Sequence, residues 1–495
     1  MRAQKTGPYR SLGLALRATF VLVAVACMLP ACTHIHRGPE EVTAALERHA
    51  RANEGTADAY AKMVTAPPPD VADAPTMRAP RTLSEFIRLA LDQSPEIKAA
   101  ELAAHAKAQR IAQVTSLPDP TVMTKTSPEP TRTAEGDNFF TLSISQKLPA
   151  PEKLDRAGRI ALEQTRIALD RLHEVRLSVI AQVKRSYFGL HLLNKKIELL
   201  EADGDLMRSL IEAARAQFRV GKRSQADVLR GEVELSNLQA QLIELGHHRQ
   251  ASRIALNSLM NRPADTPIPN FEDFELRRAE YSAQDLFARA MESNPQLQRF
   301  HRRIELRRQE LELARLASRP DFTLGFDWMS MEPRDAFVPP LNTATGVRPT
   351  VPQLSEDGSD NWAVRFGFTL PIWVAKIHAG VLEAQHNLSE AQQQYVAARN
   401  RIERTYFDAL HRFRAQKELA LLFRDSIIPQ AEQTYRVSLS SYAAGTTDFL
   451  DIIEDHRRWL TLTIRYHQAL SDLEISVADL EQAIGRSLAE MDESD

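Results

Sequence analysis

Short stretches of the chain alternate apolar and polar residues, the pattern of a half-buried β-strand. Every second residue is apolar in 322–328 and again in 362–370, whereas the residues between them are mostly Gly, Ala, Thr, Asp or Arg. The segment 140–145 alternates in the same way, and 121–127 does so more weakly. These patterns predict one β-hairpin in each half of the chain, at about 119–147 and about 321–370.

Most of the remaining chain has the spacing of long amphipathic helices. From Gly158 to Glu201 apolar residues fill heptad a and d positions, which predicts a helix of roughly 65 Å. The same pattern recurs in 235–245, 380–426 and 451–484. Each half opens with a shorter helix, at 82–92 and 282–292, that ends where a Ser-Pro or Asn-Pro step disfavours helix.

The two halves are an internal duplication, because several anchors recur in order at nearly constant separation. Phe218-x-x-Gly221-(x5)-Asp227-Val-Leu matches Tyr442-x-x-Gly445-(x5)-Asp451-Ile-Ile. An insertion of about 20 residues falls in the second hairpin. The duplication divides the chain into repeat 1 (81–262), a linker (263–280), repeat 2 (281–486) and a C-terminal tail (487–495).

The N-terminus has the features of a secretory signal, with basic residues followed by a short apolar run. Leu29-Pro30-Ala31-Cys32 is similar to the lipobox of bacterial lipoproteins. We therefore expect a signal peptide over 1–31, lipidation at Cys32 and a tether over 32–80. The alternative is an ordinary signal peptide with an incidental cysteine.

The charge balance excludes some classes of protein. With 62 Lys and Arg against 65 Asp and Glu, the net charge is -3, which argues against nucleic acid as a partner. No apolar run reaches the roughly 18 residues of a transmembrane helix, so a membrane crossing would use strands. Trp328 and Trp362 lie at the strand ends where an interfacial aromatic belt would be. A soluble two-layer sheet is the alternative.

Enzyme motifs are weak. Gly221-Lys222 lacks the upstream glycine of a phosphate loop, and no His-Glu-x-x-His occurs. His34 and His36 lie in the tether, and we interpret His247, His248 and His456 as helix-surface residues. The sequence predicts no catalysis, no metal site and no cofactor other than the covalent lipid on Cys32.

The tandem Phe/Tyr-x-x-Gly motifs, the Leu-Pro steps after each hairpin and the repeated strand-strand-long-helix order resemble the TolC-like outer-membrane factor family over 81–485. The lipobox points to its lipoprotein branch, which serves resistance-nodulation-division pumps. The resemblance implies a mainly α fold with a membrane β-barrel: a homotrimer of about 12 strands continuous with a periplasmic α-helical tunnel. A periplasmic adaptor, an inner-membrane pump and outer-membrane lipid are the implied partners.

The resemblance also places functional residues. Gly221 and Gly445 would form helix turns at the periplasmic tip, where Asp227 would contribute to adaptor contact. Tyr442, Asp451 and Glu454 map to the aromatic and acidic residues that line a narrowing of the tunnel in relatives. Rings of carboxylates favour cations in a pore. The alternative is that Asp451 and Glu454 are charges on a solvated helix face. Thr447 stands where a relative carries a gate arginine.

The predicted function is therefore passive conduction of drugs or metal ions from an inner-membrane pump to the exterior. The alternative is a non-transporting periplasmic coiled-coil lipoprotein or adaptor. The segments 118–120 and 146–153 bear a weak similarity to the heavy-metal export branch, and the cargo remains open.

Overall fold

The structure is a computed structural model that describes residues 80–133, 136–221, 224–269, 282–333, 358–444 and 446–488, with residues 271, 274, 343 and 346. The chain divides into two compact units. The strand unit includes Ala106–Gln164 and Glu305–Glu390, and the helix unit includes Lys62–His105, Thr165–Ile304 and Ala391–Asp495. The predicted signal peptide, Cys32 and the tether up to residue 79 lie outside the described residues.

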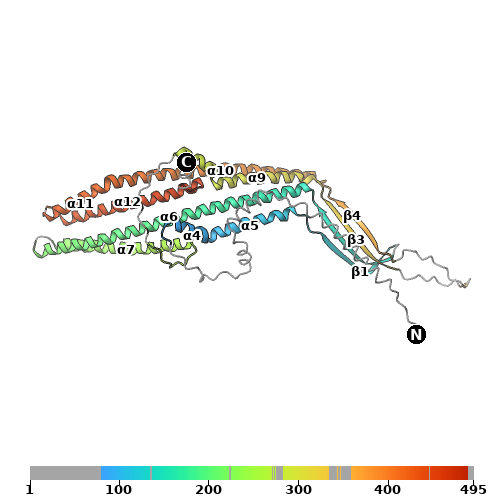
Figure 1. Ribbon diagram of the computed structural model, residues 1–495, viewed down its shortest axis with the longest axis horizontal. Helices are drawn as coiled ribbons and strands as arrows, with labels where there is room; N and C mark the ends of the chain where they lie inside the picture. Colours follow the sequence, from blue (N-terminus) through green and yellow to red (C-terminus); the bar gives the residue numbers. More distant parts are fainter. Residues whose placement is uncertain are drawn as a thin grey trace, which may run out of the picture. The chain divides into compact units, whose positions relative to one another are not determined.

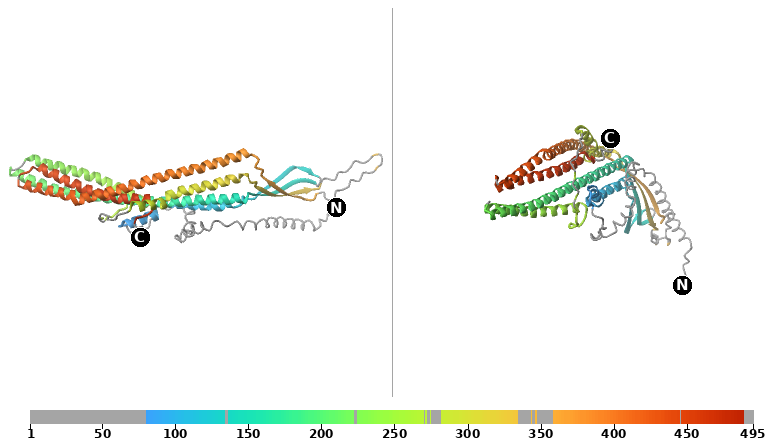
Figure 2. Two further views of the ribbon diagram at one scale, coloured as in Figure 1. Left: turned by 90° about the horizontal axis from the view of Figure 1, so that it is seen from above. Right: turned by 60° about the vertical axis from the view of Figure 1, so that its left-hand side comes forward.

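The strand unit contains one antiparallel sheet of four strands in the order β1-β2-β3-β4 (Figure 2). The strands are β1 (Thr121–Thr133), β2 (Gly136–Leu148), β3 (Phe322–Glu332) and β4 (Asn361–Phe368). The predicted hairpins correspond to the β1–β2 and β3–β4 pairs. Trp328 lies opposite Trp362 in the register.

The middle pair of strands joins the two repeats. β2 pairs with β3 from Asp137↔Glu332 to Leu148↔Phe322, although these segments are far apart in the sequence. Ala150 and Lys153, just after β2, donate hydrogen bonds to the Asp321 carboxylate that precedes β3, at 3.3 and 2.8 Å. One continuous sheet therefore forms from both repeats.

The helices follow the duplication closely (Figure 1). Repeat 1 contains α4 (Leu83–Gln93), α5 (Pro95–Thr115), α6 (Pro151–Arg219) and α7 (Gln225–Leu259). Repeat 2 contains α8 (Ala283–Ser293), α9 (Pro295–Arg315), α10 (Val374–Leu422), α11 (Ile428–Ala443) and α12 (Phe449–Ile484), with a short 3-10 turn η3 (Leu316–Ser318). The mainly helical part of the predicted fold is confirmed.

The long helix is continuous in repeat 1 and interrupted in repeat 2. α6 runs without a break for 69 residues, longer than the predicted 158–201. In repeat 2 a π-helical turn, η4 (Phe423–Ile427), separates α10 from α11. Pro429 lies in the first turn of α11, and a proline lacks the N–H that a regular helix needs. The missing hydrogen bond explains the local widening of the helix.

The core of the helix unit has two equivalent parts. α4 places Phe86 and Ala90 against α6 and the end of α7, while α8 places Leu286 and Ala290 against α10 and α12. The short helices start in the same way, because Thr82 accepts a hydrogen bond from the Glu85 N–H and Ser282 accepts one from Asp285. Such caps satisfy N–H groups that lack helical partners. The repeated sequence therefore builds repeated packing.

Candidate functional site

The turn between α6 and α7 is a candidate functional element at one end of the helix unit. Gly221 has φ 77° and donates its N–H to the Phe218 carbonyl at 2.9 Å. A side chain there would be strained by the left-handed backbone alone, because no atom lies within 4 Å of the position that a Cβ would occupy. Gly445, its predicted counterpart, and residues 222–223 lie outside the described residues.

The start of α7 buries a carboxylate. Ser224 is the N-cap, and Asp227 occupies the third position of the helix, where its N–H donates to the Ser224 carbonyl at 3.2 Å. The Asp227 side chain is buried and lies 3.8 Å from the Arg230 guanidinium. A negative charge in the first turn is favourable next to the helix dipole. In the single chain, Asp227 therefore supports the turn.

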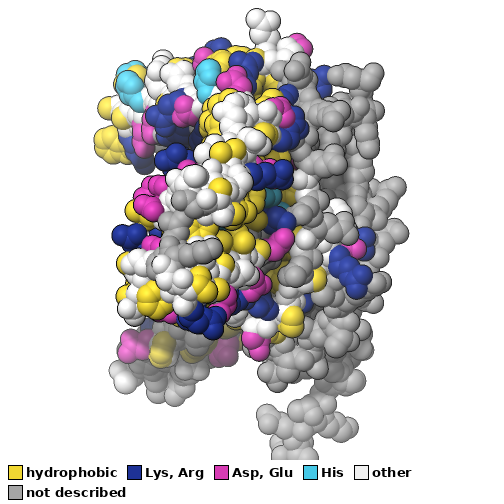
Figure 3. All heavy atoms as spheres, turned by 90° about the vertical axis from the view of Figure 1, so that its left-hand side faces the viewer, with side chains coloured by type: hydrophobic (Ala, Val, Ile, Leu, Met, Phe, Trp, Pro, Cys, Tyr) yellow, Lys and Arg dark blue, Asp and Glu magenta, His cyan; other side chains and the backbone are white. Residues whose placement is uncertain are grey.

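The start of α12 has the equivalent arrangement with an exposed carboxylate. Asp448 is the N-cap, and its N–H donates to the Asp451 carboxylate at 3.3 Å. Asp451 and Glu454 are both exposed, one helical turn apart, as their spacing predicted. Figure 3 shows that the face carrying the helix tips mixes acidic, basic and hydrophobic side chains. The acidic pair thus faces out of its own chain.

Tyr442 is separated from this acidic pair by the packing of the helices. Its ring is buried in a cluster formed by α6, α7, α11 and α12, and its centroid lies 5.8 Å from that of Phe449. Gly231 on α7 allows this packing, since a Cβ at Gly231 would lie 2.6 Å from Ile211. The three predicted gate residues therefore do not share one surface of the single chain.

A buried polar pair in the same cluster was missed by the sequence analysis. His456 Nε2 hydrogen-bonds to the Asp203 carboxylate, and the two residues are only 3% and 6% exposed. The interpretation of His456 as a helix-surface residue was wrong, whereas His247 and His248 are exposed. A signal was present, because His456 lies four residues after Ile452 and four before Leu460 on the buried stripe of α12.

Aromatic rings enclose this pair. The Tyr435 ring lies 4.8 Å from the His456 ring, and it stacks on Trp459 at 5.9 Å with an angle of 3° between the planes. Burial raises the pKa of the Tyr435 hydroxyl, and the neighbouring Asp203 charge raises it further. The pair and its aromatic neighbours fix how α6, α11 and α12 pack together.

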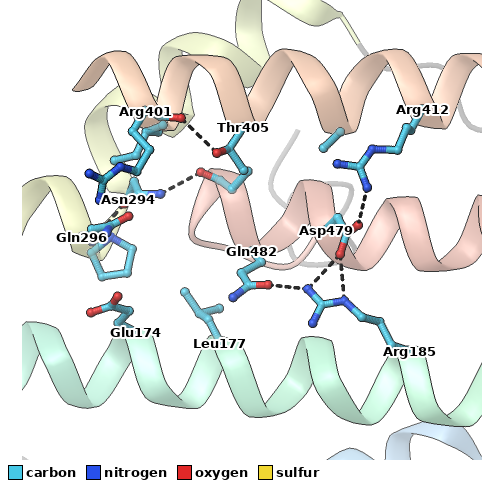
Figure 4. A pocket seen from close by; sticks show the side chains of 14 residues that line it. Glu174, Leu177, Arg185, Asn294, Gln296, Arg401, Thr405, Arg412, Asp479 and Gln482 are labelled. Carbon is cyan, nitrogen blue, oxygen red and sulfur yellow. Dashed lines mark hydrogen bonds and ion pairs between the residues drawn. The ribbon is translucent and has the colours of Figure 1, made fainter. Parts of the chain in front are cut away.

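A second polar region is a cavity of about 350 Å³ between α6, α10, α12 and the start of α9 (Figure 4). Asp479 accepts from Arg185 at 2.9 Å and from Arg412 at 3.5 Å, and Arg185 also donates to Gln482 at 2.7 Å. Asn294 closes one side by donating to the Ala483 carbonyl at 2.7 Å. These polar side chains form their hydrogen bonds within the chain. The cavity is therefore part of a junction between packed helices.

Neither metal ligation nor a helical membrane span is found in the described part of the chain. Among the described residues, no group of three or more His, Cys, Asp or Glu side chains is placed to hold a metal ion. Within those same ranges no helix is both long and apolar enough to cross a membrane.

The sheet has chemically distinct faces. Its apolar face carries Trp362, Phe366 and Phe368, which are 66%, 66% and 57% exposed. The opposite face carries small and polar residues, among which Asp327 accepts a hydrogen bond from Ser143 at 2.5 Å and pairs with Arg365 at 2.6 Å. Large apolar side chains exposed together indicate a surface that is covered by something other than water.

Comparison with known proteins gives consistent matches over both repeats. A family model described as outer membrane efflux protein matches residues 86–262 and 286–486. The cobalt-zinc-cadmium resistance protein CzcC of Cupriavidus metallidurans is 23% identical over 413 residues, which cover 82% of this chain and 90% of that protein.

Solved structures share the fold at low sequence identity. CusC, whose structures concern folding and transmembrane channel formation, superposes with a TM-score of 0.68 at 13% identity, over 86% of this chain and 100% of that one. The outer membrane protein VceC of Vibrio cholerae gives 0.65 at 17% identity, over 82% and 96% of the two chains.

Proposed function

Because the chain belongs to the outer membrane efflux protein family, we propose that three copies form the outer-membrane channel of a tripartite efflux system. The channel passively conducts cargo delivered by a periplasmic adaptor and an inner-membrane resistance-nodulation-division pump. The observation that carries this proposal is the match of both repeats to the family. A coiled-coil lipoprotein or adaptor, the alternative, would not need the four-stranded sheet.

The open edges of the sheet support assembly into a trimer. β1 and β4 each pair with only one strand of the described chain. Backbone N–H and C=O groups left unpaired in lipid cost several kcal/mol each, so both edges must be covered by other copies. Four strands from each of three copies would close a barrel of about 12 strands, an even number as in bacterial outer-membrane barrels.

The apolar face of the sheet would contact lipid, and the small, polar face would line the passage. In outer-membrane barrels, strands alternate apolar outward and polar inward residues. Phe366 and its neighbours on β4 fit the outward role because they are large, apolar and exposed. We further propose that Cys32 carries a lipid anchor, which would hold the N-terminus at the same membrane.

At the helix tips, the proposed roles follow the geometry of each residue. Asp451 and Glu454 are exposed on one helix face, so three copies could form acidic rings that favour cations. Gly221 and Asp227 shape the turn that would meet the adaptor. Tyr442, buried here against Phe449, would control the gate through helix packing.

Heavy-metal cations are the cargo class that we propose. The relative CzcC is named for cobalt, zinc and cadmium resistance, and its alignment covers most of both proteins. Cation passage also agrees with an exposed acidic pair at the helix tips. Neither argument requires a resident metal site, because a duct needs only weak contacts with its cargo.

Planar-bilayer recording of the purified, full-length protein tests the channel. We expect a trimer that forms ion-conducting pores. Phe366→Arg should prevent insertion, because an arginine on the lipid face costs about 2–4 kcal/mol per copy at the bilayer midplane. Gly367→Ser, at the neighbouring position on the other face, is the matched control and should insert, since the nearest atom to a Cβ at this position would be the Thr323 Cβ at 3.9 Å. A monomer without conductance would contradict the proposal.

Cargo is tested separately in cells that lack the gene. Restoring the wild-type gene should raise tolerance to zinc, cobalt and cadmium and lower their cellular content. A hydrophobic antimicrobial serves as the comparison. Restored drug tolerance with unchanged metal tolerance would show that the channel works and that the cargo assignment is wrong.

A further inference from the structure

One ion pair stands out on the small, polar face of the sheet. Its immediate neighbours on this face are short or lack a side chain; they include Ser143, Ser145, Thr323, Gly325, Ala363 and Gly367. Two lysines also lie on this face, Lys125 opposite Thr141 and Lys147 opposite Thr323. Within this surface Asp327 on β3 and Arg365 on β4 form an ion pair at 2.6 Å. The small neighbours on β3 and β4 leave the longer Arg365 side chain prominent between Gly325 and Asp327.

The two charges are unequally accessible. The Asp327 side chain is 16% exposed, whereas that of Arg365 is 59% exposed. Asp327 also accepts a hydrogen bond from Ser143 at 2.5 Å, so strands on both sides cover its carboxylate. Of this pair, the charge that meets solvent is therefore mainly the guanidinium.

Gly325 makes this arrangement possible. It lies directly opposite Arg365 in the strand register. A Cβ at Gly325 would lie 3.3 Å from the Arg365 Nε, so the missing side chain lets the arginine lie along β3 toward Asp327. The strands thus provide two things for the arginine: the covered carboxylate of Asp327, which holds it, and the space above Gly325, in which it lies.

We propose that Arg365, positioned by Asp327, sets the local charge preference at its level of the sheet, favouring anionic solutes over cationic ones there. This preference is opposite to the one proposed for the acidic pair at the helix tips, so the cation cargo would cross this level against an unfavourable charge. The proposal rests on the proposed function, in which the polar face lines the channel. Three copies would place three exposed guanidinium groups around one passage, and charges of one sign in a confined space strongly change the local concentration of ions. The alternative is that the pair only fastens β3 to β4.

Chemical labelling of an introduced cysteine measures the potential at this position. Ala363 lies opposite Asp327 in the register, so Ala363→Cys places a thiol beside the ion pair. The full-length protein in its membrane is treated with a thiosulfonate bearing a trimethylammonium group or with one bearing a sulfonate. The same backgrounds without Ala363→Cys correct for reaction at the native cysteines. This readout does not depend on whether the helix tips are open.

The ratio of anionic to cationic labelling rates should follow the exposed charge. Arg365→Gln uncovers the Asp327 carboxylate and should lower the ratio about tenfold or more. Arg365→Lys keeps the charge and should stay near the wild-type ratio, while Asp327→Asn removes the compensating charge and should raise it. All these differences should shrink at 1 M salt, where the screening length is about 3 Å.

Two outcomes separate this inference from the channel itself. Val364→Cys places a thiol on the apolar face and should resist both reagents; labelling as fast as that of Ala363→Cys would contradict the membrane channel. If only Ala363→Cys reacts, yet the ratio is the same with Arg365→Gln, Arg365→Lys and Asp327→Asn, the channel stands and the inference is overturned. If Arg365→Gln fails to insert, the other two variants still test the inference. A labelling ratio that is higher in Asp327→Asn than in Arg365→Lys supports it, and equal ratios overturn it.

Discussion

Gly485 ends α12 at a place where the chain has no room for a side chain, which makes a methyl group there a sharp test of the packing. Its φ of 91° is left-handed, a conformation that costs a residue with a Cβ roughly 1–2 kcal/mol. A Cβ would also lie 2.8 Å from the Pro295 Cδ, 2.9 Å from the Asn294 Cα and 3.0 Å from the Ser293 oxygen.

These neighbours are a proline ring and backbone, so they cannot rotate away. Overpacking of this kind typically costs about 1–3 kcal/mol, and Gly485→Ala should therefore destabilise the chain by about 2–5 kcal/mol in all. Gly246→Ala is the matched control. Gly246 lies within α7 with no atom within 4 Å of its Cβ position, so alanine there should stabilise the helix by about 0.5–1 kcal/mol.

Thermal unfolding of the purified protein, followed by helical circular dichroism at one fixed scan rate, measures both variants. Large membrane proteins unfold irreversibly, so the comparison is one of midpoints under identical conditions. For a chain of this size each kcal/mol moves the midpoint by roughly 1–2 °C. We expect Gly485→Ala to melt about 2–10 °C below wild type and Gly246→Ala slightly above it. Midpoints that shift equally, or in the opposite order, would refute the packing argument.

Asp203→Ala leaves the buried His456 imidazole without its acceptor and should cost about 1–3 kcal/mol, seen as a lower melting midpoint; an unchanged midpoint would mean that the pair is dispensable. Replacing Asp451 with Asn and Glu454 with Gln should lower cation selectivity and block by multivalent cations in single-channel recordings, and unchanged recordings would return both residues to a solvated helix face. Cys32→Ala should abolish incorporation of labelled fatty acid, and labelling of that variant would disprove the lipidation site.

The elements that depend on local sequence were predicted best. Alternation in 322–328 and 362–370 predicted strands because a side-chain period of two is a property of the extended backbone itself. Thr82 and Ser282 mark helix starts for an equally local reason, since their hydroxyls satisfy N–H groups in the next turn. Gly221 was predicted at a turn because the left-handed conformation found there favours glycine.

Other features depended on partners distant in the sequence. Tyr442 and Asp451 belong to one motif, yet the ring is buried against Phe449 while the carboxylate is exposed. The position of His456 on the apolar stripe of α12 indicates burial, but the carboxylate that makes the burial favourable belongs to Asp203, 253 residues away. A buried polar side chain needs such a partner, and spacing within one helix does not reveal it.

The sequence by itself determined the duplication, the two hairpins, the long amphipathic helices and the turn at Gly221, because each is encoded in the period or in the conformational limits of neighbouring residues. Only the tertiary structure decided that β2 pairs with β3, that Asp203 meets His456, and that Arg365 lies along Gly325 to reach Asp327. A period says which face of an element is apolar or polar. The element that covers that face is chosen by packing across the whole chain, and packing joins residues that no local pattern connects.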